Sequence, residues 1–446
     1  MIHTKKVLIQ FQRGYCTVSA TPVHLRDKKI LINGSDIAGL SLGLFLKKKG
    51  ISCDIVDTNS TITTTTTQMV QNSIRKTTSE VKPNVGGVVV YNHVYDLLKK
   101  LGVYDQLLEK SLQLEGSCFT ERDGAAYGIF NFIKLKQEKN PLSISEADMK
   151  DILLSECLKF KPSEGIVSIK KSTKIKSIQQ SPNSNNNNNN NNKVMITFSN
   201  SPVKVSYDAL IGSANSIENV DTVRQYLFDK LDKEPSFYKD THYFSTIVKK
   251  CNQPDIPMIN TQFAYEKKLV TFPISSTQVA ISGSFFKPRL PPHNHKHLIF
   301  HEFYDMEDVN SHNIISFQDS ATENIALGKV DEQMLKSYSL DNICLIGDAA
   351  DKLPYDNLLI TSIAIEDANQ LADSIGQSTS SNLSESISKF DRQRQTRMTN
   401  KYLPIIKAEQ SIIFRPDWLV YLFGKYYFKY FCSGKKQLKR LKSLFH

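Results

Sequence analysis

Three residues near the start of the chain have the types and spacing needed to bind a dinucleotide. Gly34 and Gly39 flank the beginning of an apolar run, and Asp57 follows the strand-like segment after it. In this pattern the glycines allow a tight turn and close packing, the helix N-terminus attracts a pyrophosphate, and the acid binds a ribose hydroxyl. The pattern also asks for glycine at position 36, where Asp36 adds bulk and a negative charge facing the phosphates.

The segment that carries these residues has the order strand, turn, helix, strand. Residues 30–32 are a short apolar run, leucines recur through 40–46, and Gly50 ends that stretch. A second apolar run covers 53–56. Residues 29–57 therefore predict a βαβ unit of a parallel sheet, with the glycine turn at the helix N-terminus.

A second turn of the same kind lies far along the chain. Residues 341–346 form an apolar strand that ends at Gly347 and Asp348, and Pro354 precedes a predicted helix. An acid at a strand-to-helix turn can contact a ligand or can cap the next helix. Both interpretations of Asp348 stay open at this stage.

The order of these segments resembles the flavoprotein aromatic hydroxylases, the single-component FAD monooxygenases that include the ubiquinone-biosynthesis hydroxylases and the squalene epoxidases. The resemblance extends from residue 28 to about residue 400 and includes GGVVVYNHVYDLL from Gly86, SISEADMKDILL from Ser143 and IGDAADKLP from Ile346. It implies an α/β fold: a Rossmann-like FAD-binding domain with a parallel sheet, interleaved with a smaller mixed β-sheet substrate domain and followed by C-terminal helices. The FAD contacts that it implies are Gly34, Gly39, Asp57, Gly347, Asp348 and Pro354.

Several positions depart from the family's pattern, and each departure opposes FAD. Glu146 stands where the family usually has an arginine near the cofactor, so an anion replaces a phosphate-binding cation. Leu358 and Ile360 replace paired glycines that let the backbone approach the flavin ring. The full set of departures is Asp36, Glu146, Ala214, Asn215, Leu358 and Ile360.

The expected FAD-binding-like domain is discontinuous and is formed by residues 28–110, 140–215 and 340–400. The substrate-type sheet is expected from residues 111–139 and 216–339, where strand-like runs dominate.

Three further segments have biased composition. The asparagine-rich residues 183–193 are expected to form a solvated loop at the tip of a hairpin. Residues 1–26 contain basic residues and no acid, which predicts either a mitochondrial transit peptide or a disordered basic tail. Residues 401–446 form an aromatic and basic C-terminal tail, and within it 411–446 could contact a membrane surface or pack on the protein itself.

The overall charge is basic, with 56 Lys+Arg against 45 Asp+Glu and a formal net charge of +11. Much of the excess lies at the two ends, and no basic face with interleaved aromatics marks the body of the chain, so we expect no nucleic-acid partner. Seven scattered cysteines without a CxxC pair argue against a disulfide framework and favour a reducing compartment. No ligand set is completed around His293, His295, His297 and His301, so we expect no metal site.

Two functions follow from these observations. One is an FAD-dependent monooxygenase in the mitochondrial matrix, associated with the inner membrane, that uses NAD(P)H and hydroxylates a lipophilic aromatic substrate of the quinone-precursor type. The other is an inactive homologue of that fold that has lost normal FAD binding and acts as a binding or assembly partner. In neither case does the sequence identify a catalytic side chain, because in this family the flavin carries out the reaction.

Overall fold

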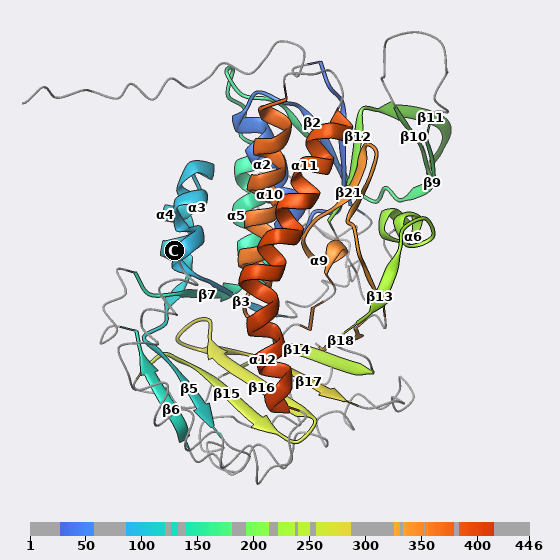
Figure 1. Ribbon diagram of the computed structural model, residues 1–446. Helices are drawn as coiled ribbons and strands as arrows, with labels where there is room; N and C mark the ends of the chain where they lie inside the picture. The colour runs from blue at the N-terminus through green and yellow to red at the C-terminus, as the bar shows by residue number, and fades with distance from the viewer. Residues whose placement is uncertain are drawn as a thin grey trace, which may run out of the picture.

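The computed structural model of the chain contains two large sheets and a layer of helices (Figure 1). The residues that it describes are 27–57, 86–120, 126–132, 139–180, 193–213, 222–236, 240–249, 256–286, 325–330, 333–351, 353–354, 356–378 and 383–413.

The first large sheet has six strands in the order β20-β21-β12-β1-β2-β8, and only β20 runs antiparallel to its neighbour. Its central strand β1 is fully buried, as expected for a parallel strand covered on both faces. The predicted βαβ unit and parallel sheet are therefore confirmed. The strands are β1 (Ile30–Asn33), β2 (Cys53–Val56), β8 (Val167–Lys170), β12 (Ala209–Gly212), β20 (Ser339–Leu340) and β21 (Ile343–Leu345).

One face of this sheet is covered by helices, whose apolar residues form the largest core cluster together with inward-facing residues such as Ile30 and Ile32. Figure 1 shows α2, α5, α10 and α11 side by side in this layer. The helices are α2 (Ile37–Lys48), α3 (Tyr95–Leu101), α4 (Tyr104–Lys110), α5 (Glu146–Leu158), α10 (Ile360–Gly376) and α11 (Leu383–Arg397), with a 3-10 turn η1 (Asn92–Val94) before α3.

The opposite face packs against a small antiparallel sheet and α6 through a second core cluster that includes Leu31 and Leu210. In the small sheet β9 and β10 pair as a hairpin, and the tip of the expected asparagine-rich loop lies outside the described residues. The elements of this layer are β9 (Ile175–Gln180), β10 (Val194–Phe198), β11 (Ser201–Tyr207) and α6 (Thr222–Phe228).

The second large sheet has seven strands in the order β18-β14-β17-β16-β15-β5-β6, antiparallel except between β15 and β5. Two short sheets, β3-β7-β4 and β13-β19, complete the fold. The strands of the seven-stranded sheet are β5 (Gly116–Thr120), β6 (Ala126–Asn131), β14 (Thr241–Lys249), β15 (Met258–Ala264), β16 (Lys267–Pro273), β17 (Gln278–Phe286) and β18 (Ala326–Lys329). The remaining elements are β3 (Gly87–Val90), β4 (Leu112–Gln113), β7 (Leu142–Ser145), β13 (Lys233–Pro235), β19 (Gln333–Leu335), α9 (Gly347–Ala350), η2 (Met398–Tyr402) and α12 (Leu403–Ile413).

A buried lysine joins the seven-stranded sheet to the helical side of the molecule. Lys268 on β16 is only 3% exposed, and its Nζ lies 2.9 Å from an Oε2 of Glu409 on α12 and 3.2 Å from the carbonyl oxygen of Asp356. Ser284 on β17 donates a hydrogen bond of 2.7 Å to Oδ2 of the same Asp356. The loop before α10 is thus fixed to the sheet by groups that are costly to separate, because they are buried.

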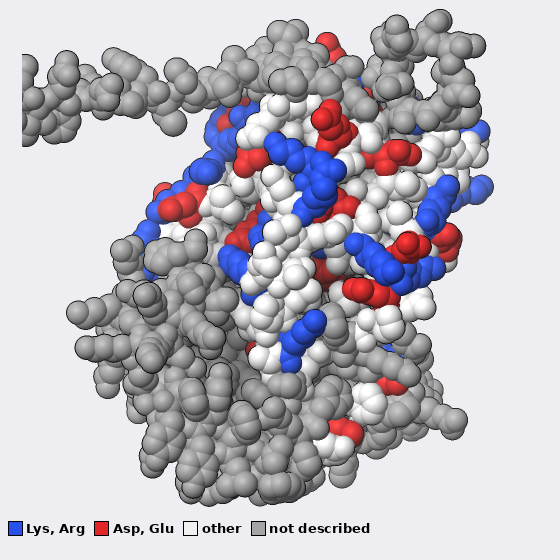
Figure 2. All heavy atoms as spheres, viewed as in Figure 1, with Lys and Arg blue, Asp and Glu red and all other residues white. Residues whose placement is uncertain are grey.

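Basic and acidic side chains are interspersed on the face shown in Figure 2, where described residues are visible over the helical layer. Among the described residues, no helix is long and apolar enough to cross a bilayer. His293, His295, His297 and His301 lie outside the described residues, as do residues 1–26 and 414–446.

Candidate binding groove at the two glycine turns

The first glycine turn has the geometry of a dinucleotide-binding unit. Gly34 has a φ of 130°, a conformation that favours glycine, and its N–H donates to the carbonyl oxygen of Val56 at 3.0 Å. A Cβ on Gly39 would lie 2.2 Å from the carbonyl oxygen of Gly34, so no side chain fits there. Asp57 is buried and accepts a hydrogen bond of 2.6 Å from Ser35 Oγ.

Asp36 is the N-cap residue of α2. Its Oδ1 accepts a hydrogen bond of 2.8 Å from the backbone N–H of Gly39. Acidic side chains are preferred at this position because they satisfy a free amide and interact favourably with the helix dipole. The chain therefore supplies its own anion at the helix N-terminus where the dinucleotide pattern places a pyrophosphate.

The second glycine turn packs directly against the first. Gly347 has a φ of 55°, and a Cβ there would lie 2.6 Å from the Cβ of Ala38 on α2. Its N–H donates to Oδ2 of Asp367 at 3.1 Å. The two turns, distant along the chain, thus converge at one edge of the parallel sheet. Pro354 is buried in the following loop, where its carbonyl oxygen accepts from the N–H of Asn357 at 2.9 Å.

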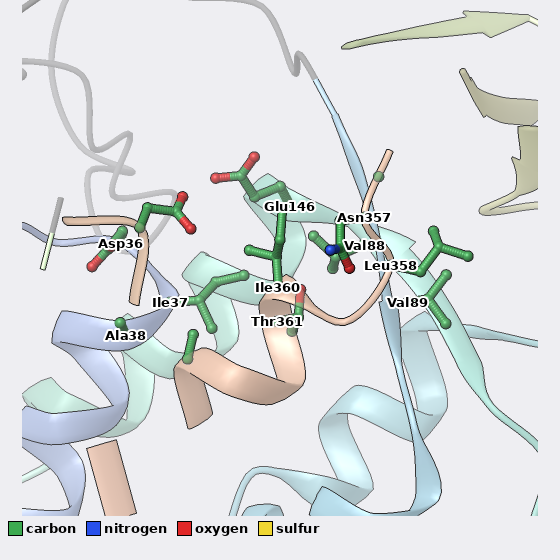
Figure 3. A pocket seen from close by; sticks show the side chains of 13 residues that line it. Asp36, Ile37, Ala38, Val88, Val89, Glu146, Asn357, Leu358, Ile360 and Thr361 are labelled. Carbon is green, nitrogen blue, oxygen red and sulfur yellow. The ribbon is translucent and has the colours of Figure 1, made fainter. Parts of the chain in front are cut away.

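A groove that is open to solvent lies where these turns meet β3 and the start of α10. Three carboxyl groups line it, from Asp36, Glu146 and Asp348. Figure 3 shows Asp36 and Glu146 at one end of the groove and Leu358 and Val89 at the other.

Two carboxyl groups of the groove, those of Asp36 and Asp348, have a raised pKa. Burial, followed by the charges of Asp36 and Glu146, raises the pKa of Asp348 to about 8. Burial also raises the pKa of Asp36. Lys150 forms an ion pair of 2.6 Å with Glu146. Burial alone would lower the pKa of Lys150, but Glu146, Asp36 and Asp348 raise it above its ordinary value.

The structure brings only some of the expected site residues to the groove. Asp348 lines it, together with four of the departures from the family pattern: Asp36, Glu146, Leu358 and Ile360. Gly34, Gly39, Asp57, Gly347 and Pro354 support the turns and are not among the lining residues. Ala214 and Asn215 lie outside the described residues.

Two residues, one in the groove and one beside it, were not singled out from the sequence. Asn357 lines the groove beside Leu358. Its position in the sequence between Pro354 and Leu358, two residues already assigned to the site, could have indicated that it lies there. Lys150 follows Glu146 by four positions on the same helix, the spacing of a helical ion pair.

A second charged cluster lies behind the turns, and its charges are balanced. Arg394 on α11 is fully buried, with Nε 2.8 Å from Asp367 Oδ2 and an Nη 2.5 Å from Asp351 Oδ2. Arg397 pairs with the other oxygen of Asp367, and Tyr338 donates to Asp351 at 2.9 Å. Burial alone would lower the pKa of Arg394, but Asp351 and Asp367 hold it well above its ordinary value.

Arg224 holds the second turn from its other side. It is buried on α6, and its guanidinium donates to the carbonyl oxygens of Ala349 and Ala350. Capping of the last carbonyls of α9 in this way satisfies acceptors that have no helical partner. Among the described residues, no group of three or more side chains is arranged to hold a metal ion.

The residues present do not suit FAD in the pose that the family resemblance implies. The turns keep their glycine geometry and Asp57 keeps its place, but none of the described lining residues is basic and three are acidic. Each negative charge of a pyrophosphate placed about 4 Å from an ionised carboxylate would be opposed by roughly 1–4 kcal/mol, depending on the local dielectric. Ile360 and Leu358 also place branched side chains in the groove, where the family has glycines.

No protein-family model matches the chain, and no curated protein matches it in sequence. Solved structures match over nearly its full length. HpxO of Klebsiella pneumoniae, complexed with FAD and uric acid, is 14% identical with a TM-score of 0.66, over 94% of this chain and 96% of that one. The p-nitrophenol 4-monooxygenase PnpA of Pseudomonas putida is 13% identical with a TM-score of 0.67, over 94% and 97%. PqsL of Pseudomonas aeruginosa, a probable FAD-dependent monooxygenase, is 14% identical with a TM-score of 0.60, over 86% and 94%.

Proposed function

We propose that this chain, which has the fold of the FAD-dependent monooxygenases, no longer holds FAD in the usual pose and acts as a binding or assembly partner. One observation carries the proposal: the Asp36 carboxylate accepts the hydrogen bond of the Gly39 amide at the N-terminus of α2. A helix N-terminus that already has an anion at hydrogen-bond distance is a poor site for a pyrophosphate. Glu146 and Asp348 in the same groove act in the same direction.

The proposed setting is the matrix side of the mitochondrial inner membrane, with a lipophilic small molecule as ligand. The acid-free, basic residues 1–26 and the aromatic, lysine-rich residues 411–446 support this setting. Both segments fall outside the described residues except for the end of α12.

The second candidate is an active monooxygenase that hydroxylates a lipophilic aromatic of the quinone-precursor type with NAD(P)H as reductant. It is favoured by the intact turns: Gly34 with its positive φ, the close packing at Gly39, and Asp57 at the end of β2. In that case these residues would hold the dinucleotide half of FAD, and bound FAD would supply the redox chemistry.

The visible absorption spectrum of the purified chain lacking residues 1–26 distinguishes the two candidates. We expect a colourless, folded protein that does not bind added FAD in a calorimetric titration. A yellow protein with one FAD per chain that oxidises NAD(P)H would overturn the proposal in favour of the monooxygenase.

A variant that restores the family's residues at two positions gives a more direct test of FAD binding. The double substitution Asp36→Gly and Glu146→Arg removes two of the three carboxyl groups and restores a cation beside the turn. We expect it to bind FAD at least tenfold more tightly than the unmodified chain, a difference of about 1.4 kcal/mol. Glu109→Gln on the exposed face of α4 is the control for an altered charge and should leave FAD binding unchanged.

A further inference from the structure

The groove has an acidic end and an apolar end, and this division indicates the chemistry of its ligand. Asp36 and Glu146 lie at the acidic end, whereas Leu358 and Val89 lie at the apolar end (Figure 3). A molecule with one charged end and an apolar body matches such a surface, because the apolar part leaves water while the charge keeps a partner.

The sign of the preferred charge follows from the groove's own charges. Three carboxyl groups line it, and none of the described lining residues is basic. Lys150, next to the groove, forms its ion pair with Glu146 and also acts on Asp36 and Asp348. Glu146 is thus paired with Lys150, and among the described lining residues the other two carboxyl groups, of Asp36 and Asp348, attract a second cation and repel an anion once they are ionised.

The side-chain amide of Asn357 can donate a hydrogen bond to an acceptor on a ligand. Asn357 is 5% exposed, and its Oδ1 accepts a hydrogen bond of 3.1 Å from the N–H of Leu359. Its Nδ2 is buried and has no hydrogen-bond partner among the residues that the structure describes. In Figure 3 this nitrogen is turned toward Val88 and Ile360, which also line the groove. A buried donor without a partner is costly, and an oxygen on a bound molecule would satisfy it.

We propose that the groove binds an organic amine whose apolar body carries an oxygen acceptor. The ammonium group lies against Asp36, Glu146 and Asp348, and the body lies along Ile37 and Ile360 toward Leu358. The oxygen accepts a hydrogen bond from Nδ2 of Asn357. This inference rests on the proposed function, since a dianionic cofactor and an ammonium compete for the same end of the groove.

Proton release accompanies binding of the amine. The groups that act on Asp348 are Asp36, Glu146 and Asp351, which raise its pKa, and Lys150, which lowers it. With a pKa of about 8, Asp348 is largely protonated at neutral pH. An ammonium beside it favours the ionised form, so binding displaces a proton and becomes tighter as the pH rises from about 6 to about 8.

Matched probes of the same shape test the proposal on the purified chain without residues 1–26. They are 4-(4-methoxyphenyl)butylamine, the corresponding alcohol and the corresponding carboxylic acid, with 4-phenylbutylamine as the probe that lacks the oxygen. We expect the amine to bind at least tenfold more tightly than the acid and more tightly than the alcohol. Titration calorimetry in two buffers of different ionisation enthalpy should show release of a proton at neutral pH.

Two variants locate the contacts. Glu146→Gln should weaken binding of the methoxy amine about tenfold and reduce the preference for amine over acid, whereas Glu109→Gln on α4 should change neither. Asn357→Leu should abolish the difference between the methoxy amine and 4-phenylbutylamine. Circular dichroism confirms that each variant is folded, and the probe series on the unmodified chain is decisive even if a variant does not fold.

The outcomes separate this inference from the proposed function. A colourless protein that binds the acid as tightly as the amine, or binds none of the probes, overturns this inference and leaves the proposed function standing. A protein that retains FAD overturns both.

Discussion

Two clusters of charged side chains lie on either side of the second glycine turn, and they differ in whether their charges are balanced. Behind the turn, Arg394 and Arg397 pair with Asp351 and Asp367. In front of it, the carboxyl groups of Asp36, Glu146 and Asp348 lie near one ammonium among the described residues, that of Lys150. Buried charge is retained at low cost only where it is paired. The first cluster therefore stabilises the fold, whereas the second keeps an excess of charge that suits a ligand.

Removal of the central cation of the balanced cluster should have the largest effect. Arg394→Met leaves Asp351 and Asp367 buried without their guanidinium partner, so we expect the free energy of unfolding to fall by about 3–5 kcal/mol. Denaturant unfolding at neutral pH measures this loss. Arg392→Met, an exposed position on the same helix, is the control and should change stability by less than about 0.5 kcal/mol. Equal unfolding midpoints for the two variants would show that the cluster does not support the fold.

The close packing of the first glycine turn can be tested by adding one methyl group. Gly39→Ala places a Cβ 2.2 Å from the carbonyl oxygen of Gly34, and backbone cannot yield easily, so we expect a loss of about 1–3 kcal/mol. Gly376→Ala at the end of α10 meets only the flexible side chain of Lys49, at 2.9 Å, and should be nearly neutral. Thermal unfolding of the two variants compares them, and a neutral Gly39→Ala would contradict the close approach of Gly39 to the carbonyl oxygen of Gly34.

The unbalanced cluster should destabilise the fold in a pH-dependent way. Because the pKa of Asp348 is raised to about 8, the folded state binds a proton that the unfolded state has lost. Stability therefore falls as the pH rises from about 4 to about 8, and Asp348→Asn removes this fall. We expect the variant to be more stable than the unmodified chain by about 1–2 kcal/mol above pH 8, after allowance for partial exposure, and little different near pH 4. Unfolding curves with the same pH dependence for both proteins would rule out a raised pKa.

The smallest expected effect is the loss of the N-cap. Asp36→Ala leaves the Gly39 amide without its acceptor and should lower stability by about 1 kcal/mol, whereas Asp36→Asn keeps an acceptor and should cost less. Urea unfolding of the pair measures the difference. A loss shared equally by both variants would indicate that charge, not the hydrogen bond, is responsible.

The sequence predicted the first turn well because its determinants are local. Gly34, the apolar run after it and Asp57 lie within one βαβ unit, and their spacing is fixed by that unit. The role of Asp36 as the N-cap of α2 was not predicted, although aspartate is favoured at that position. The parallel sheet and the convergence of the two turns followed from the resemblance and were confirmed.

The balanced cluster and the hydrogen bonds of Asn357 in the groove could not be predicted in the same way. Arg394 meets Asp351 and Asp367 only because α11 packs against α10 and the second turn, and no spacing in the sequence encodes that contact. The hydrogen-bonding state of Asn357 depends on how its loop turns, which is set by distant residues. The link from Lys268 to Asp356 joins the seven-stranded sheet to the loop before α10, and the sequence does not reveal it before the fold is known.

The buried ammonium of Lys268 connects the rim of the groove, formed by Asp356 and Asn357, to the rest of the molecule. It holds Asp356, the neighbour of Asn357, and also Glu409 near the end of α12. If Asp356 and Asn357 moved away from the sheet, the ammonium of Lys268 would have to move with them or remain unpaired in an apolar interior. The rim, the seven-stranded sheet and the base of the C-terminal segment therefore behave as one stiff body, and a molecule that fits the groove must accept its shape.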